Sequence, residues 1–165
     1  FLVLRMCLGQ FRYRAVAFDQ IIEEVQSGRA AAGLLIHEGQ LTYRDQKLQR
    51  VADLGEWWKR ETGLPLPLGG NALRRDLDRG TARKWCDVLR DTVQYALDHR
   101  KEALDYAIEF ARGMDRKKAD KFVGMYVNSY TLELGKRAED AVALLFKVGR
   151  DAGFIPVKVE PEFID

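Results

Sequence analysis

One of the two histidines in this 165-residue chain stands where an aliphatic run ends. His37 follows Leu34-Leu35-Ile36 and precedes Glu38 and Gly39. Imidazole has an ordinary pKa of about 6.5, so it can transfer protons in both directions near neutral pH. An apolar strand end would disfavour the charged ring and keep His37 as a neutral base. The residues therefore make His37 a candidate general base, and a hydrogen-bonded structural histidine is the alternative that they leave open.

The two residues after His37 have separate predicted tasks. Gly39 would let the backbone turn sharply and leave the imidazole at the wall of a cleft. Glu38 would point to the opposite face of the strand from His37, because side chains alternate along a strand. We therefore expect Glu38 to hold the loop and not to pair with the imidazole.

A second candidate site is Gly69-Gly70-Asn71, which follows the stretch Leu64-Pro65-Leu66-Pro67-Leu68. Two prolines exclude a central helix and favour an extended strand with one unpaired edge. The glycines permit positive φ and close approach of the backbone to a ligand. This stretch is predicted to be an interlobe crossover in which Gly69, Gly70 and Asn71 contact substrate, with a plain turn as the alternative.

No spacing in the sequence is typical of a metal or cofactor site. Cys7 and Cys86 are far apart, which favours two reduced thiols, and His99 lies in a polar junction where it is expected to be a surface or helix-capping residue. No Cys, His or carboxylate spacing around His37 matches a zinc site, and Gly69-Gly70 is no phosphate loop. We predict no metal and no cofactor.

Composition limits the classes of partner. The net charge is +2, from 27 Lys and Arg against 25 Asp and Glu, which gives no general footprint for nucleic acid or membranes. No apolar run approaches the roughly 20 residues that a membrane span needs. The two reduced thiols favour a cytoplasmic protein, and the composition leaves a small molecule as a possible class of partner and the oligomeric state open.

The first part of the chain has a strand-helix-strand pattern. Residues 12–18 alternate as a short strand, residues 20–26 place apolar side chains on one helical face after Asp19 as N-cap, and residues 30–36 suit a strand covered on both faces. This is a βαβ unit. The pair Trp57-Trp58 is expected to pack a short helix onto it, and stacking on a planar ligand is the alternative.

The second part is predicted to be helical. Thr81 and Asp115 are expected to cap two of its helices, and a further helix runs from about Lys136 to Ala152 and closes at Gly153. Tyr126 to Thr131 mixes amide and hydroxyl groups inside a predicted helix, which suggests a tie to the interlobe strand or a ligand contact. The inward stripe predicted for the first helix consists of Trp85, Val88, Leu89, Thr92, Val93, Ala96 and Leu97.

Three stretches together resemble a known enzyme family. They are AGLLIHEGQLTY (Ala32 to Tyr43), TGLPLPLGGNALRRDL (Thr62 to Leu77) and MYVNSYT (Met125 to Thr131). In this order they are similar to the 1,4-dihydroxy-6-naphthoate synthases of the futalosine route to menaquinone. The resemblance covers nearly the whole chain.

The resemblance implies an α/β, type 2 periplasmic-binding-protein-like fold with two lobes and ligand in the cleft. It implies that His37 matches the family's catalytic histidine, the proton acceptor in a lyase reaction on cyclic dehypoxanthine futalosine that uses no metal or redox cofactor. Residues 1–75 would be the second lobe ending in the crossover. Residues 76–165 would be a mainly helical part that packs on the first lobe.

The family's N-terminal lobe has no counterpart in these residues, so we expect a fragment that is inactive alone or is completed by another polypeptide. A non-catalytic solute-binding protein of the same fold is one rival hypothesis. Chorismate dehydratase is another, and His37-Glu38-Gly39-Gln40 argues against it because that family has a Gly-Asp-x-Ala-Leu-like motif there.

Overall fold

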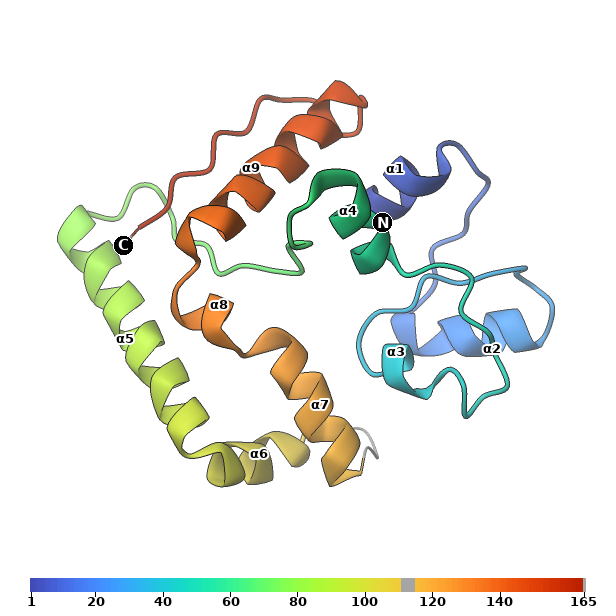
Figure 1. Cartoon of the computed structure of the whole chain (residues 1–165), viewed down its shortest axis with the longest axis horizontal. Helices are drawn as coiled ribbons and strands as arrows, with labels where there is room; N and C mark the ends of the chain where they lie inside the picture. The colour runs from blue at the N-terminus through green and yellow to red at the C-terminus, as the bar shows by residue number, and fades with distance from the viewer. Residues whose placement is uncertain (111–114, 165) are drawn as a thin grey trace. The chain divides into compact units, whose positions relative to one another are not determined.

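The computed structural model describes residues 1–110 and 115–164, and in these ranges all regular secondary structure is helical (Figure 1). The chain forms two compact units, Phe1–Gly63 and Leu64–Asp165. The division into residues 1–75 and 76–165, which followed the proposed lobes, stays a prediction.

The first unit consists of short helices joined by long irregular segments. Its elements are α1 (Leu2–Leu8), the 3-10 turn η1 (Phe18–Gln20), α2 (Ile21–Gln26), α3 (Gly39–Thr42) and α4 (Leu54–Thr62). Of these, α1 packs against α4, and α2 continues directly from η1.

Helix α4 is well defined at both ends. The Asp53 side chain accepts hydrogen bonds from the backbone N–H groups of Gly55 (2.9 Å) and Glu56 (3.0 Å), and Gly63 ends the helix with φ of 72°. Trp58 on this helix is 1% exposed and is the largest fully buried side chain. The prediction that a tryptophan packs this helix onto the unit is therefore confirmed for Trp58.

The predicted strands are wrong for this structure. Residues 12–18 are irregular up to the start of η1, residues 30–36 are irregular, and neither segment pairs with a strand in the part of the chain that the structure describes. A strand is completed by ladder hydrogen bonds to a neighbour, and an extended segment without one is not a strand. The α/β layering and the βαβ unit are thus not seen. The predicted helix is present as α2, but Asp19 lies within η1 and does not cap it.

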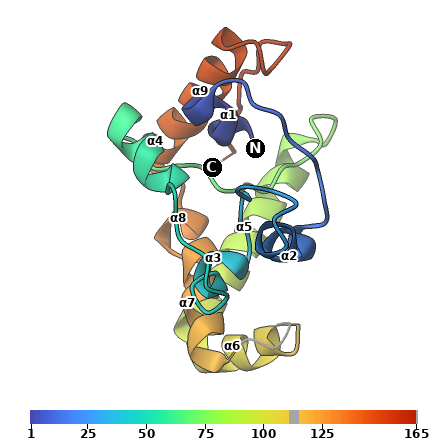
Figure 2. The ribbon, with the colours of Figure 1, turned by 90° about the vertical axis from the view of Figure 1, so that its right-hand side faces the viewer.

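The second unit contains the longer helices. They are α5 (Arg79–Asp98), α6 (Arg100–Ile108), α7 (Arg116–Tyr126), α8 (Ser129–Leu132) and α9 (Gly135–Asp151). Figures 1 and 2 show α6 at the far end of α5, with α7 returning from there toward α8. Contacts between α5 and α6, α6 and α7, and α5 and α8 hold this arrangement.

Aspartate side chains begin two of these helices. Asp115 accepts a hydrogen bond from the Lys118 N–H at 2.9 Å, which confirms it as the cap of α7. Asp78 accepts from the Thr81 N–H at 2.9 Å, so Asp78 caps α5, and the prediction of Thr81 as the cap is wrong. At the end of α9, Gly153 has φ of 75° and donates its N–H to the Arg150 carbonyl, as predicted.

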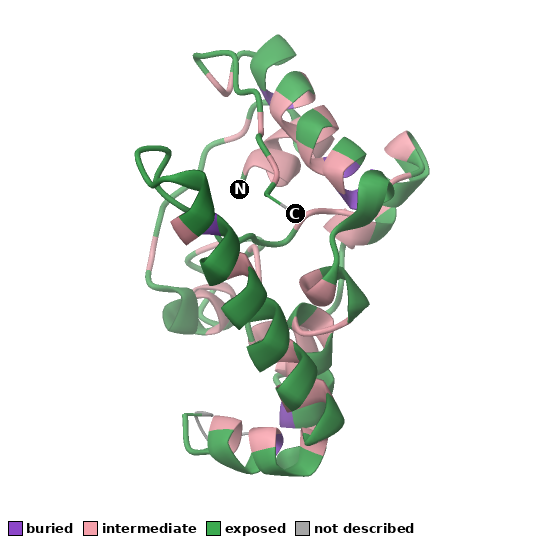
Figure 3. Cartoon of the chain, turned by 90° about the vertical axis from the view of Figure 1, so that its left-hand side faces the viewer, coloured by how far each residue is buried: buried purple, intermediate pink, exposed green. Residues whose placement is uncertain are grey.

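The predicted inward stripe of α5 is only partly covered. Val93, Ala96 and Leu97 are half-buried, but Trp85 is 58% exposed, Val88 is 57% exposed, and Leu89 and Thr92 are also exposed. Figure 3 shows most of the long helix α5 coloured as exposed. Helices α6 and α8 cover only part of the predicted stripe of α5, so the prediction is wrong for these four side chains. Among the described residues of this unit, the buried side chains are Ala82, Leu104, Ala119, Ala138 and Ala141.

Within residues 1–110 and 115–164, no helix is both long enough and apolar enough to cross a membrane.

Candidate functional site

His37 lies between the irregular segment 30–36 and helix α3, and its backbone is in the left-handed region. Its φ is 57°, a conformation that costs a residue with a Cβ about 1–2 kcal/mol. Such strain persists only where the surrounding structure holds it, and it clusters at functional sites. The sharp turn predicted at Gly39 therefore occurs at His37 itself, and Gly39 is the first residue of α3.

The His37 ring is held by an aromatic contact on one side. Its centroid lies 4.6 Å from that of Phe18, with an angle of 46° between the ring planes. Phe18 is the first residue of η1, and the His37 side chain is exposed. The imidazole is thus positioned and open to solvent, which suits a group that must meet a substrate.

The turn after His37 is fixed by the main chain. The Gln40 N–H donates to the His37 carbonyl at 3.2 Å, and the Glu38 carbonyl accepts from the Leu41 N–H at 2.9 Å. The Thr42 hydroxyl also donates to the Glu38 carbonyl at 3.2 Å. These bonds use the backbone carbonyl of Glu38, so the expectation that its side chain holds the loop stays a prediction.

Gly33 brings the segment that leads to His37 close to α2. A Cβ built at Gly33 would lie 2.4 Å from Ile21 Cγ2 and 3.2 Å from Val25 Cγ2. Both atoms belong to β-branched side chains, which are stiff at χ1 and cannot easily move aside. Only glycine therefore fits where residues 30–36 cross the apolar face of α2.

Glu24 ties both flanking segments to α2. Its carboxylate pairs with Arg14, from residues 12–18, and accepts from Arg29 Nε at 2.9 Å. Arg29 also reaches Glu23 at 3.0 Å, and the Ala30 N–H donates to the Glu24 carbonyl at 3.0 Å. The Glu24 side chain is 15% exposed, so these pairs are less screened than ordinary surface pairs. The segment that carries His37 thus has polar as well as apolar anchors.

The other predicted site residues, Gly69, Gly70 and Asn71, belong to the second unit and are exposed. Neither glycine has positive φ, and a Cβ at either would meet no atom within 4 Å. The positive φ that the sequence permits is therefore not used, and the structure leaves open space beside this backbone. His37 and these three residues belong to different units, and a role for any of them in binding stays a prediction.

The stretch Tyr126 to Thr131 forms a junction between two helices and does not lie inside one. Helix α7 ends at Tyr126, and Asn128 begins α8 with a capping box. The Asn128 side-chain oxygen accepts from the Tyr130 N–H at 3.0 Å, and the Asn128 N–H donates to the Thr131 hydroxyl oxygen at 3.2 Å. That hydroxyl donates in turn to the Tyr126 carbonyl at 2.8 Å. The amide and hydroxyl groups thus have a local task, joining α7 to α8.

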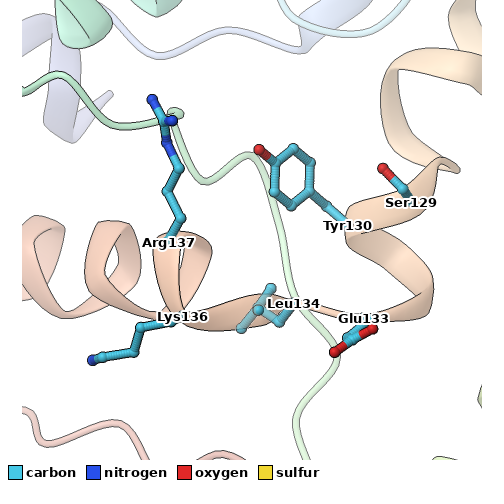
Figure 4. Close-up of a pocket in the computed structure, with 7 residues that line it drawn as sticks. Ser129, Tyr130, Glu133, Leu134, Lys136 and Arg137 are labelled. Carbon is cyan, nitrogen blue, oxygen red and sulfur yellow. The ribbon is translucent and has the colours of Figure 1, made fainter.

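A hollow of about 410 Å³ opens beside this junction, at the start of α9 (Figure 4). In Figure 4 the side chains of Tyr130 and Arg137 extend toward the same side, and Lys136 extends away from them. Lys136 is engaged by Asp140 at 2.5 Å, which raises the pKa of the lysine. The lining residues are Ser129, Tyr130, Glu133, Leu134, Gly135, Lys136 and Arg137.

Sequence reasoning missed both Phe18 and this hollow. Phe18 was assigned to the alternation of a strand, and its contact with a residue 19 positions later has no sequence signal. Tyr130 lines the hollow and belongs to the stretch from Tyr126 to Thr131, for which the sequence suggested a ligand contact. Its aromatic ring was therefore the one feature of the sequence that could have indicated the hollow. Across residues 1–110 and 115–164, no three His, Cys, Asp or Glu side chains gather in a way that could hold a metal ion.

Comparison with known proteins decides the family. Residues 1–151 match the model of a family described as menaquinone biosynthesis. The chain belongs to this family. It is 41% identical over 149 residues to the 1,4-dihydroxy-6-naphthoate synthase of Thermus thermophilus, which covers 90% of this chain and 55% of the relative. The Streptomyces coelicolor enzyme of the same name is 37% identical over 139 residues, covering 84% of this chain and 49% of its own length.

The chain is also similar to a solved structure. The crystal structure of a protein from Archaeoglobus fulgidus matches with a TM-score of 0.90 and 39% identity, over 93% of this chain and 58% of that one. The chain spans about half the length of the curated menaquinone biosynthesis relatives that it matches. The resemblance to 1,4-dihydroxy-6-naphthoate synthases is therefore confirmed as homology.

Proposed function

We propose that this chain carries the general base, His37, of a lyase that converts cyclic dehypoxanthine futalosine to 1,4-dihydroxy-6-naphthoate. The observation that carries the proposal is the 41% identity over 149 residues to the Thermus thermophilus synthase. Because the chain spans about half of that relative, the activity and substrate of the whole enzyme are part of the proposal. So are the cytoplasmic location and the two-lobed, type 2 periplasmic-binding-protein-like fold.

The geometry at His37 supports this role. The residue combines a left-handed backbone, an aromatic neighbour at 4.6 Å and an exposed ring. A structural histidine would be expected to lie buried with its nitrogens satisfied, whereas a base must reach the proton of a substrate. The exposed ring therefore favours the base.

The chemistry assigned to this chain is proton transfer. The neutral imidazole of His37 would take a proton from the substrate and so start cleavage of the carbocycle-sugar framework, releasing dihydroxynaphthoate and a sugar-derived fragment. A positioned base of this kind contributes about 10²- to 10⁴-fold in rate. Gly69, Gly70 and Asn71 would contact the substrate; all three are exposed, and there is open space beside the two glycines.

The segments without strand partners fit the same proposal. Residues 30–36 are small and aliphatic, and in a complete family fold they would pair with strands supplied by the rest of the protein. The apolar side of α5 would likewise be covered there.

A full-length chimera tests this function. This chain would replace the 149 matched residues of the Thermus thermophilus relative, and release of dihydroxynaphthoate from the cyclic futalosine derivative would be followed. We expect turnover. A chimera that melts cooperatively and binds the derivative without converting it would contradict the proposal and would favour the solute-binding alternative.

A further inference from the structure

The segment that follows α9 returns to the start of α5 (Figure 1). Arg75 Nη1 lies 3.3 Å from Glu162 Oε2, and Arg79 Nη2 lies 3.8 Å from Glu162 Oε1. Arg75 also donates to the Glu160 carbonyl at 3.1 Å. One carboxylate thus faces two arginines that are distant from it in sequence and close to Asp78, the cap of α5.

We infer that residues 158–164 form an electrostatic strap that restrains the stretch from Gly69 to Arg79. Arg75 is the point of attachment, because it uses one guanidinium nitrogen for the Glu162 side chain and another for the Glu160 backbone. Two such contacts from one planar guanidinium fix its direction better than a single ion pair does. Pro161 and Phe163 in the same segment are half-buried.

The strap is weak enough to open. The side chains of Arg75, Arg79 and Glu162 are 75%, 90% and 58% exposed. Ion pairs of this exposure contribute little to stability and are screened by salt. The strap is therefore closed at low ionic strength and released when the pairs are screened or the carboxylate is removed.

The strap would affect the stretch that is proposed to contact the substrate. Asn71 stands four residues before Arg75 on an exposed stretch, so a closed strap limits the positions that Gly69, Gly70 and Asn71 can take. This consequence rests on the proposed role of those residues in substrate binding. The strap itself does not, because it is defined by contacts within Leu64–Asp165.

Backbone NMR relaxation of the whole chain tests the strap without any assay of activity. In Glu162→Gln, we expect the heteronuclear NOE of the amides of residues 159, 160 and 162–164 to fall, with the released population rising roughly two- to fivefold. Arg75→Gln should give the same change, and the double variant should add little to either single one. Raising NaCl from about 0.05 M to about 0.5 M should release the strap in the unsubstituted chain and leave Glu162→Gln unchanged.

Glu160→Gln is the matched control. It removes a carboxylate from the same strap, where that carboxylate pairs with Lys158, and it keeps the backbone carbonyl that Arg75 uses. We expect it to leave the NOE values of residues 162–164 in place. Unchanged NOE values in Glu162→Gln, or an equal fall in Glu160→Gln, would overturn the strap and leave the proposed lyase function untouched.

Discussion

At the scale of single residues, two positions near the proposed base have unusual backbone or steric constraints. His37 adopts a backbone conformation that glycine tolerates better, and its ring lies against Phe18. Gly33 lies so close to α2 that any Cβ would overlap with Ile21. Both positions lie within five residues of each other on the segment that carries the proposed base, so this segment has little freedom to change.

Replacing Gly33 by alanine should destabilise the first unit. Loss of glycine flexibility alone would stabilise the chain by about 0.4–1 kcal/mol, but overpacking against a β-branched side chain costs about 1–3 kcal/mol, so the clash prevails. Urea unfolding followed by tryptophan fluorescence would measure the difference. Gly69→Ala, which places its Cβ in open space, should change stability little, and an equal loss in both variants would contradict this explanation.

At the scale of elements, side-chain caps mark the starts of α5, α7 and α8, and ion pairs join α6 to α7. Asp78, Asp115 and Asn128 each accept a backbone N–H at a helix start. Between helices, Arg100 of α6 reaches Asp120 of α7 at 2.9 Å, and Arg116 of α7 pairs with Asp105 of α6. These contacts position the α7–α8 junction beside which the hollow opens.

Asn128→Ala should weaken the junction between α7 and α8. It removes the acceptor for the Tyr130 N–H and the amide that donates to the Gly124 carbonyl, and loss of such a cap costs about 0.5–2 kcal/mol. Amide hydrogen exchange of residues 127–133 would show the faster opening. Ser129→Ala keeps the Asn128 cap and should exchange at close to the original rate, and equal acceleration in both variants would count against the capping box.

Asp105→Asn should loosen the pairing of α6 with α7 in a pH-dependent manner. Hydrogen bonds from Arg116 and then Lys101 lower the pKa of the Asp105 carboxyl below its ordinary value of 3.8. Because the pKa of Asp105 is lower in the folded protein, its carboxylate stabilises the folded state fully above pH 3.8. This stabilisation is lost as the pH falls through the pKa of the folded state. The variant should therefore unfold more easily than the original chain at pH 7, and the two should converge at acidic pH below 3.8.

Thermal unfolding at several pH values would measure this convergence. Asp87→Asn is the control, because Asp87 pairs with Arg90 within α5 and joins no two helices. A difference between Asp105→Asn and the original chain that persisted in strong acid would refute the assignment.

At the scale of the whole molecule, the sequence allowed the family to be predicted better than the fold. Patterns that depend on neighbours along the chain were confirmed: the helix at 20–26, the Asp115 cap, the Gly153 stop and the packing role of Trp58. Strand predictions at 12–18 and 30–36 required partners that the described residues do not supply, and the apolar side of α5 required a cover. The spacing of apolar residues predicts that one face of a helix or strand is apolar, but it does not predict which other segment packs against that face.

The candidate site shows the same limit. His37 could be singled out because an imidazole after an aliphatic run is a local signal, whereas its left-handed backbone and its contact with Phe18 depend on how distant segments meet. The turn was therefore predicted at Gly39, where glycine is the usual indicator, although it occurs at His37.

The most direct test of the central claim is the turnover of His37→Ala in the full-length chimera. If His37 is the general base, kcat should fall by about 10²- to 10⁴-fold while binding of the cyclic futalosine derivative is largely kept. His99→Ala removes the other histidine, which stacks on Tyr95 at the end of α5, and should keep its activity within about twofold. A His37→Ala enzyme that turns over as fast as the His99→Ala control would contradict the account.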